Sequence, residues 1–211
     1  VYLNFLKKKN EKIWPRGLPL EYIYNRPVLN SKKIVSKFYL QQGVCEGNPD
    51  VDAIYRLTNP KINIKFKNNY KYSLGKCLSP FNSQNTIWFK KIFPLLYLPV
   101  TCTMRATDIW RSLIALNILQ KDNKEILFFG TTMFQKRNIH NLYNDFKEEI
   151  PTYLHNKRIV EILKSLNLKK GSHNYLNNLK SSYKSLVQND IISINEINYL
   201  DSWIKDCKSL I

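Results

Sequence analysis

The stretch that decides the fold is Leu98-Pro-Val-Thr-Cys-Thr-Met-Arg-Ala-Thr-Asp-Ile-Trp-Arg111. It begins as a short β-prone run, Val100 to Thr103. Apolar residues then recur near a period of 3.6, which predicts a helix; they are Ile109, Trp110, Leu113, Ile114 and Leu116 to Ile118. Thr107 is a favourable N-cap, and Asp108 in the first turn suits the unpaired N–H groups and the helix dipole. The sequence therefore predicts a carboxylate at a strand-to-helix junction, held by rigid elements and open to a cleft.

The segments around this stretch predict alternating strands and helices. Lys33 to Gln41 and Glu125 to Phe129, which ends at Gly130, are rich in β-forming residues, and residues 59–79 are typical of edge strands or a hairpin. This alternation predicts an α/β domain over residues 1–150, whose loops carry the site. Residues 151–211 are expected to form a helical C-terminal extension. Its helices are predicted from Ile159 to Leu166 with an end near Gly171, from Tyr175 to Val187, and from Ser193 to Leu210.

The composition indicates a folded protein with a real hydrophobic core. Hydrophobic residues make up 44% of the 211 residues, aromatic residues make up 13%, and 33 basic against 16 acidic residues give a net charge of +17. The lysines are scattered among asparagines and isoleucines, and no nucleic-acid-binding motif accompanies them. We expect no nucleic-acid partner, and a phosphate or nucleotide-sugar ligand would suit the charge equally well.

The cysteines and the apolar runs of the sequence indicate whether the chain binds zinc or enters a membrane. The four cysteines lie far apart without a C-x-x-C pair, which argues against a zinc site. No apolar run is long enough to span a bilayer and no signal peptide is present. The chain begins at Val1 instead of methionine, which indicates a fragment.

Asp50-x-Asp52 is a candidate metal motif, because two carboxylates at this spacing can hold a divalent cation and through it a diphosphate. However, Pro49 and Asp50 also resemble a helix start, where acidic residues are ordinary. We favour helix capping over metal binding, and the sequence predicts no metal ligand.

Two loops offer candidate substrate contacts. Asn82 to Thr86 is a polar cluster between Phe81 and the apolar Ile87-Trp88-Phe89, and it either satisfies itself in a turn or faces a polar ligand such as a sugar. Trp14-Pro-Arg-Gly17 should be an ordered loop, in which Arg16 either faces a ligand or belongs to a surface turn fixed by a buried Trp14.

Four segments in order resemble the STELLO family, whose members are assigned as glycosyltransferases. The resemblance covers roughly residues 13 to 150, and a fainter one runs to the reversibly glycosylated polypeptides, the plant UDP-arabinose mutases. The matching segments are Trp14-Pro-Arg-Gly-Leu-Pro-Leu-Glu21, Gln41-Gln-Gly43 with Pro49-Asp-Val-Asp-Ala-Ile-Tyr-Arg56, Pro80-Phe-Asn-Ser-Gln-Asn-Thr-Ile-Trp88, and Leu98-Pro-Val100 with Thr107-Asp-Ile-Trp-Arg111.

The resemblance implies the acceptor-side half of a GT-A-like, Rossmann-related mixed sheet. It implies transfer of a sugar from a nucleotide-sugar donor to a glycan or another hydroxyl acceptor, in the Golgi, with protein partners in the Golgi membrane. In the family, an acidic nucleotide- and metal-binding motif lies upstream of the Trp-Pro-Arg-Gly segment. This chain lacks that motif, so a divalent metal such as Mn or Mg is expected only in the full-length protein.

By the same resemblance, Asp108 matches a general base at the start of an acceptor-side helix. Arg105 and Arg111 would bind substrate, as would Arg16, and Asn82, Ser83 and Asn85 would line the acceptor cleft. His140 is either a phosphate or metal contact or a surface residue. The alternative for Asp108 is a cap that pairs with Arg105. The alternative for the chain is a non-catalytic assembly factor with a glycosyltransferase-like fold.

Overall fold

The protein is described from a computed structural model, which covers residues 13–23, 38–59, 61–67, 70–73, 75 and 77–210. A four-stranded mixed sheet has the order β2-β4-β1-β3. Its strands are β1 (Leu40–Gly47), β2 (Lys71–Ser73), β3 (Thr86–Trp88) and β4 (Ile126–Gln135). The central β1 and β4 are parallel, whereas β3 is antiparallel to β1 and β2 is antiparallel to β4. The predicted α/β class is confirmed, and the architecture is consistent with a partial Rossmann-like fold.

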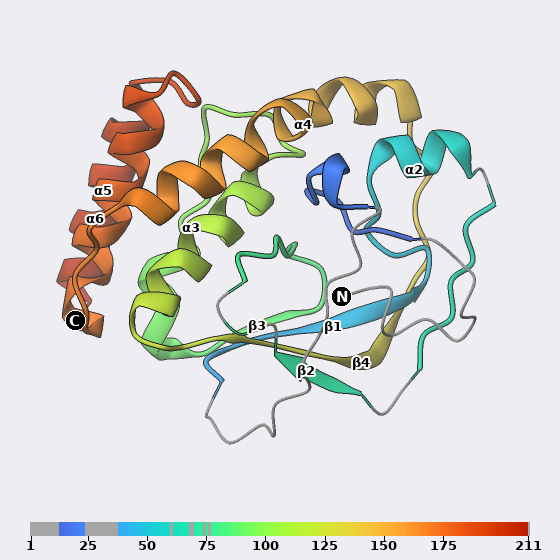
Figure 1. The fold of residues 1–211 in the computed structure, drawn as a ribbon, viewed down its shortest axis with the longest axis horizontal. Coiled ribbons are helices and arrows are strands. Elements are labelled where there is room, and N and C mark those ends of the chain that lie inside the picture. Colours follow the sequence, from blue (N-terminus) through green and yellow to red (C-terminus); the bar gives the residue numbers. More distant parts are fainter. Residues whose placement is uncertain are drawn as a thin grey trace.

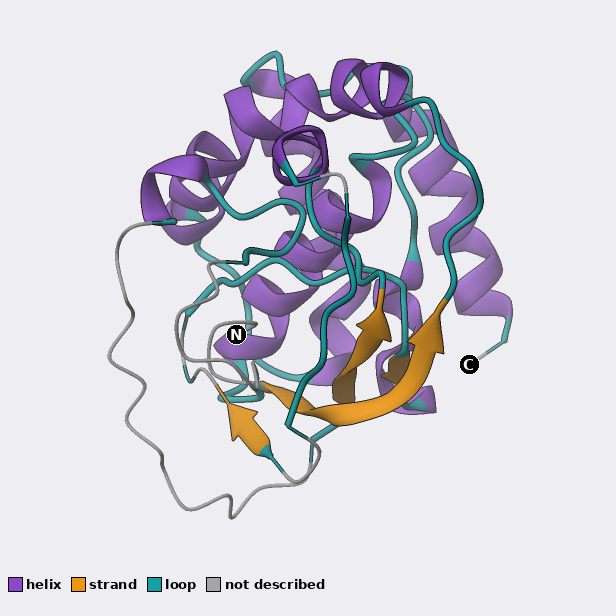
Figure 2. Cartoon of the chain, turned by 90° about the vertical axis from the view of Figure 1, so that its right-hand side faces the viewer, coloured by secondary structure: helices purple, strands orange, loops and turns teal. Residues whose placement is uncertain are grey.

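The helices lie on one side of this sheet (Figures 1 and 2). They are α2 (Ala53–Thr58), α3 (Thr107–Lys121), α4 (Leu142–Ser165), α5 (Tyr175–Gln188) and α6 (Glu196–Ser209). Three short 3₁₀ segments accompany them, η1 (Leu20–Tyr22), η2 (Lys90–Leu96) and η3 (Ser172–Asn174). In the part of the chain that is described, no helix combines the length and apolar character needed to cross a membrane.

Helix α3 is the centre of the core. It contacts α4, α5 and η2, and its buried residues include Ile109, Trp110 and Leu113. A helix with apolar side chains on nearly every face is stable only when other elements cover those faces, as they do here. The position of α3 inside the molecule therefore fixes the direction in which its first turn, with Asp108, points.

The long helix α4 runs across residue 150, where the sequence predicts a domain boundary. One apolar core joins Ile109 of α3 to Ile159 of α4 and Leu179 of α5. Asn156 of α4 accepts a bond from Trp110 Nε1 at 2.9 Å and donates to the Gly17 carbonyl at 2.7 Å. The C-terminal helices thus share a core with the sheet-bearing part, and the division into two domains stays a prediction.

Two local expectations for the central stretch are wrong. Val100 to Thr103 is not a strand, because the N–H groups of Val100 and Thr101 donate to the Glu196 carboxylate instead of a sheet. Thr107 is the first residue of α3 and not its N-cap, and its hydroxyl donates to the Met104 carbonyl at 3.1 Å.

Several element ends also differ from those predicted. Strand β1 begins at Leu40, so Gln41 lies near its start, while residues 31–37 fall outside the described residues. Strand β4 continues past Gly130, because an irregularity between Gly43 and Cys45 lets its last residues pair with β1 again. Helix α4 ends at Ser165, before the predicted end near Gly171, because the backbone of Leu166 is extended.

Candidate functional site

A pocket of about 380 Å³ opens at the start of α3. Its charged lining comes from Arg16, Arg105, Asp108, His140, Asp145 and Glu148. The remaining lining comes from Ser83, Leu98, Met104 and Thr107. Segments far apart in the sequence therefore meet at one place, as expected for a site built from loops and helix starts on a rigid core.

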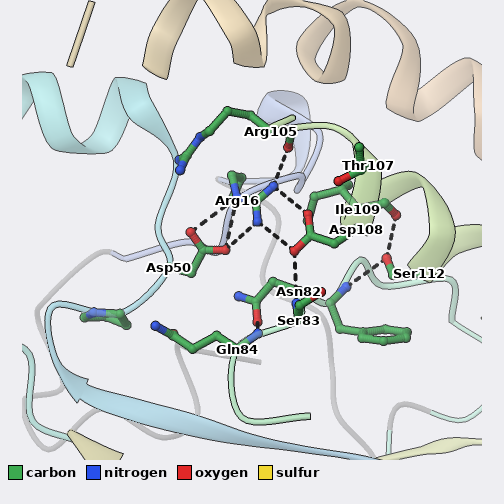
Figure 3. Close-up of polar contacts among 12 residues, drawn as sticks. Arg16, Asp50, Asn82, Ser83, Gln84, Arg105, Thr107, Asp108, Ile109 and Ser112 are labelled. Atoms are coloured by element: carbon green, nitrogen blue, oxygen red, sulfur yellow. Dashed lines mark hydrogen bonds and ion pairs between the residues drawn. The ribbon is translucent and has the colours of Figure 1, made fainter. Parts of the chain in front are cut away.

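Asp108 is held on one side of this pocket by three hydrogen bonds (Figure 3). Arg16 donates to Oδ1 at 2.9 Å and to Oδ2 at 3.0 Å, and the Ser83 N–H donates to Oδ2 at 2.9 Å. The position in the first turn of α3 is as predicted, whereas the partner is Arg16 and not Arg105. A carboxylate held by three donors in this way is fixed in orientation.

Arg16 joins Asp108 to Asp50. Its Nε and Nη2 donate to Asp50 at 2.8–3.2 Å, and its Nη1 also donates to the Arg105 carbonyl. All five N–H donors of this buried side chain thus have partners within the protein. Arg16 holds the two carboxylates, and its predicted contact with substrate stays a prediction.

The charges in this cluster reinforce one another. Burial alone would lower the pKa of Arg16, but Asp50 and Asp108 raise it well above its usual value. Burial alone would raise the pKa of Asp50, but the charge and hydrogen bonds of Arg16 lower it. Arg16 and Asp50 therefore each stabilise the charged form of the other.

Arg105 and the start of α4 form a second layer of ion pairs. Arg105 donates to the fully buried Glu149, Nε at 2.8 Å, and the second Glu149 oxygen accepts from the Ala53 N–H and the Tyr153 hydroxyl. Arg105 is thus attached to α4 while its side chain lines the pocket. The N-terminal part of α4, which contains Glu149, therefore takes part in positioning the site.

His140 lies in the pocket lining beside Asp145. Its Nδ1 is 3.5 Å from an Asp145 oxygen, and Asp145 also pairs with Arg137 at 3.2 Å. Burial and the neighbouring charge of Arg105 lower the pKa of Arg137. The pocket thus presents both positive and negative groups, with acidic residues on the α4 side.

The polar cluster at residues 82–86 largely satisfies itself in a turn. Asn82 is buried, and its Oδ1 accepts from Gln42 Nε2 at 2.7 Å and from the Gln84 N–H at 3.0 Å. Asn85 adopts a left-handed conformation with φ of 52° and donates to Thr132 Oγ1 at 3.0 Å. Of the three predicted contacts in this segment, the pocket lining includes Ser83.

Arg111 supports Ser83 from the protein interior. It is buried, its Nη2 donates to Ser83 Oγ at 2.8 Å, and its guanidinium carbon lies 5.0 Å from the centre of the Trp88 ring. Burial lowers the pKa of Arg111. Because the Ser83 oxygen accepts this bond, its own proton can point to a ligand in the pocket.

The two aspartates of Asp50-x-Asp52 have different structural roles. Asp50 pairs with Arg16, whereas Asp52 caps α2, accepting from the Tyr55 N–H at 2.7 Å and from Trp14 Nε1. The capping prediction is confirmed for Asp52 alone. Within the described residues, no group of three or more His, Cys, Asp or Glu side chains is placed to hold a metal ion.

Sequence reasoning missed the contributions of α4 and of the loop before α3. Asp145, Glu148, Leu98 and Met104 line the pocket and Glu149 pairs with Arg105, but the sequence analysis assigned no role to any of them. A weak signal was available, since Asn141 followed by Asp145 is a typical helix start. Acidic residues at a helix start can equally well face solvent, so the signal could not place them in a site.

Fold and pocket together define an α/β protein with a polar site at the start of helix α3, and comparison with known proteins gives a more specific class. The family model for STELLO glycosyltransferases matches residues 105–211. The chain belongs to this family. The match includes the Arg105–Arg111 segment and the C-terminal helices.

Two Arabidopsis thaliana proteins are similar to the chain over nearly its whole length. One carries the name probable glycosyltransferase STELLO2 and is 23% identical over 97% of this chain. The other carries the name probable glycosyltransferase STELLO1 and is 24% identical over the same share. The chain spans 27% of the length of each relative.

Proposed function

We propose that the chain is the acceptor-side part of a GT-A-like glycosyltransferase, which transfers a sugar from a nucleotide-sugar donor to a hydroxyl. Family membership supports sugar transfer as the class of reaction. The separate observation that carries the proposal is the carboxylate of Asp108 in the pocket lining. The Golgi as the location rests on the same family resemblance.

Asp108 has an acceptor position available for a substrate. A carboxylate can accept about four hydrogen bonds, and Arg16 and Ser83 supply three of them. The remaining position, among the described contacts, is on Oδ1. In the proposed reaction a substrate hydroxyl donates to this oxygen.

In the transfer step, the hydroxyl oxygen forms a bond to the anomeric carbon of the donor. The bond from that carbon to the diphosphate oxygen breaks, the diphosphate leaves with the electron pair, and the hydroxyl proton moves to Asp108 Oδ1. Arg16 keeps the carboxylate ionised and aimed, and the Ser83 hydroxyl, supported by Arg111, donates to a substrate oxygen. No step is assigned to a metal, because the described residues do not fit one.

The test is turnover by the full-length protein with a panel of nucleotide sugars, followed as release of nucleoside diphosphate. Asp108→Asn should reduce turnover by about 10²–10⁴-fold, because Asn cannot take the proton. Asp206→Asn, an exposed change on α6, is the matched control and should leave turnover unchanged. Undiminished turnover in Asp108→Asn would exclude the base. Absence of turnover from the unaltered protein, across the panel, would favour a non-catalytic assembly factor.

A further inference from the structure

The loop before α3 presents three exposed aliphatic side chains beside the pocket. Met104 is 79% exposed, Val100 is 55% exposed and Leu98 is 43% exposed. Leu98 and Met104 belong to the lining of the pocket itself. Single exposed apolar residues are normal on a protein surface, but here three lie within seven residues of one loop, and two of them line a polar pocket.

This loop is fixed by a buried carboxylate from the C-terminal helices. Glu196, the first residue of α6, is 0% exposed. It accepts from the Val100 N–H at 3.1 Å, from the Thr101 N–H at 2.9 Å and from the Thr101 hydroxyl at 2.7 Å. The Tyr97 hydroxyl also donates to it. Losing these bonds would leave several donors unsatisfied, so the loop is held firmly.

Further contacts hold the end of the loop that leads into α3. Thr103 donates to the Glu148 carbonyl at 2.6 Å, and Arg105 donates to Glu149 at 2.8 Å. The loop is thus anchored from α4 as well as from α6. The outward position of its aliphatic side chains follows from these anchors.

We propose that Leu98, Val100 and Met104 form an apolar lip that binds a hydrocarbon group of the substrate. The polar pocket would take the hydroxyl-bearing part, and the lip would take an attached alkyl or aryl group. The substrate class is therefore an amphipathic alcohol or glycoside. The placement of the hydroxyl at Asp108 rests on the proposed function, whereas binding at the lip requires no catalysis.

The mixed charge of the pocket favours a small molecule over a membrane surface as the occupant of the lip. The pocket lining carries three acidic side chains, Asp108, Asp145 and Glu148, beside two basic ones, Arg16 and Arg105. An anionic lipid surface attracts clusters of basic side chains, and this lining is not such a cluster. A small amphipathic molecule can place its polar end among these groups and its apolar end on the lip.

The experiment measures binding of methyl and hexyl β-D-glucoside to the full-length protein, below micelle-forming concentrations, by calorimetry and saturation-transfer NMR. Hexyl glucoside should bind more tightly than methyl glucoside. Met104→Gln should weaken hexyl glucoside about fivefold and leave methyl glucoside unchanged, because it removes apolar contact area. Met133→Gln is the matched control, since Met133 is 54% exposed on β4 and outside the pocket lining.

Equal affinity for the two glucosides, or no binding of either, would overturn the proposal. An equal loss in Met133→Gln would do the same. A loss of phosphatidylserine vesicle binding in Met104→Gln, with glucoside affinity unchanged, would assign the lip to membranes instead. The outcome is independent of the base assignment: Asp108→Asn could retain turnover while Met104→Gln still removes the preference for hexyl glucoside.

Discussion

Two carboxylates stand at the beginning of helices and are held in opposite ways. Asp108, in the first turn of α3, pairs with a buried arginine and lines a pocket. Glu196, the first residue of α6, is completely buried and is held by hydroxyl and amide donors. No basic group forms an ion pair with Glu196 among the described residues.

The difference shows how the same side-chain chemistry serves two purposes. An arginine keeps Asp108 charged and leaves part of its surface for a ligand, which suits a reactive or ligand-binding group. Neutral donors occupy Glu196 and tie one loop to one helix, which suits a structural role. The second carboxylate positions the loop that leads to the first, so the site depends on both.

The largest expected effect comes from removing the counter-charge at the pocket. Arg16→Met should lower the free energy of unfolding by about 4 kcal/mol, because the buried Asp50 and Asp108 both lose the cation that forms hydrogen bonds to them. Urea denaturation measures it, and Arg158→Met, at an exposed arginine of α4, should change stability by less than about 0.5 kcal/mol. A loss below about 1 kcal/mol in Arg16→Met would show that the cluster contributes little to folding.

A somewhat smaller loss of stability is expected when Glu196, the carboxylate held by uncharged donors, is removed. Glu196→Ala should lower the free energy of unfolding by about 3 kcal/mol, because it removes the fully buried acceptor of the Tyr97 hydroxyl and of the Val100 and Thr101 N–H groups. Hydrogen exchange should also become faster at the amides of Val100 and Thr101. Glu161→Ala, at an exposed position of α4, is the control. Unchanged exchange at both amides would contradict the anchoring role.

Asp52 is a third buried carboxylate, and it should make the stability of the protein depend on pH. Burial raises the pKa of Asp52 to about 6, above the value of about 3.9 in an unfolded chain. The folded state therefore holds the proton more strongly, and stability should fall by about 2–3 kcal/mol as pH rises from about 4 to 6. Asp52→Asn should remove this decline, measured as the free energy of unfolding at several pH values.

Asp50 should show the opposite sign, which separates it from Asp52. Arg16 lowers the pKa of Asp50 against the effect of burial, so its stabilising contribution is present above about pH 4 and is lost as pH falls through the folded-state pKa. Asp50→Asn should therefore flatten the acid side of the stability profile. The same profile in both variants would contradict the distinct roles of the two aspartates.

The smallest effect is expected at the lip. Met104→Gln should change the free energy of unfolding by less than about 0.5 kcal/mol, because an exposed side chain gives up little packing. Thermal denaturation of the variant beside Met133→Gln would measure it. A large loss would mean that Met104 supports the fold and is not free to contact a ligand.

Local sequence patterns were enough to predict the fold class and the central helix α3. The apolar repeat from Ile109 onward predicted α3, and it also placed Asp108 in the first turn. The predicted helix over Tyr175 to Val187 agrees with α5 to within one residue. Such predictions succeed because periodicity and first-turn preferences depend on residues near one another in the chain.

The sequence by itself thus determined the α/β class, the central helix and the position of Asp108 at its start. Only the tertiary structure decided that Arg16, 92 residues away in sequence, would hold this carboxylate, and that Glu196 would hold the loop before it. Local preferences predict a strand from Val100 to Thr103 and an N-cap at Thr107. The fold overrides them, because buried N–H groups and charges must find partners wherever the packed chain provides them.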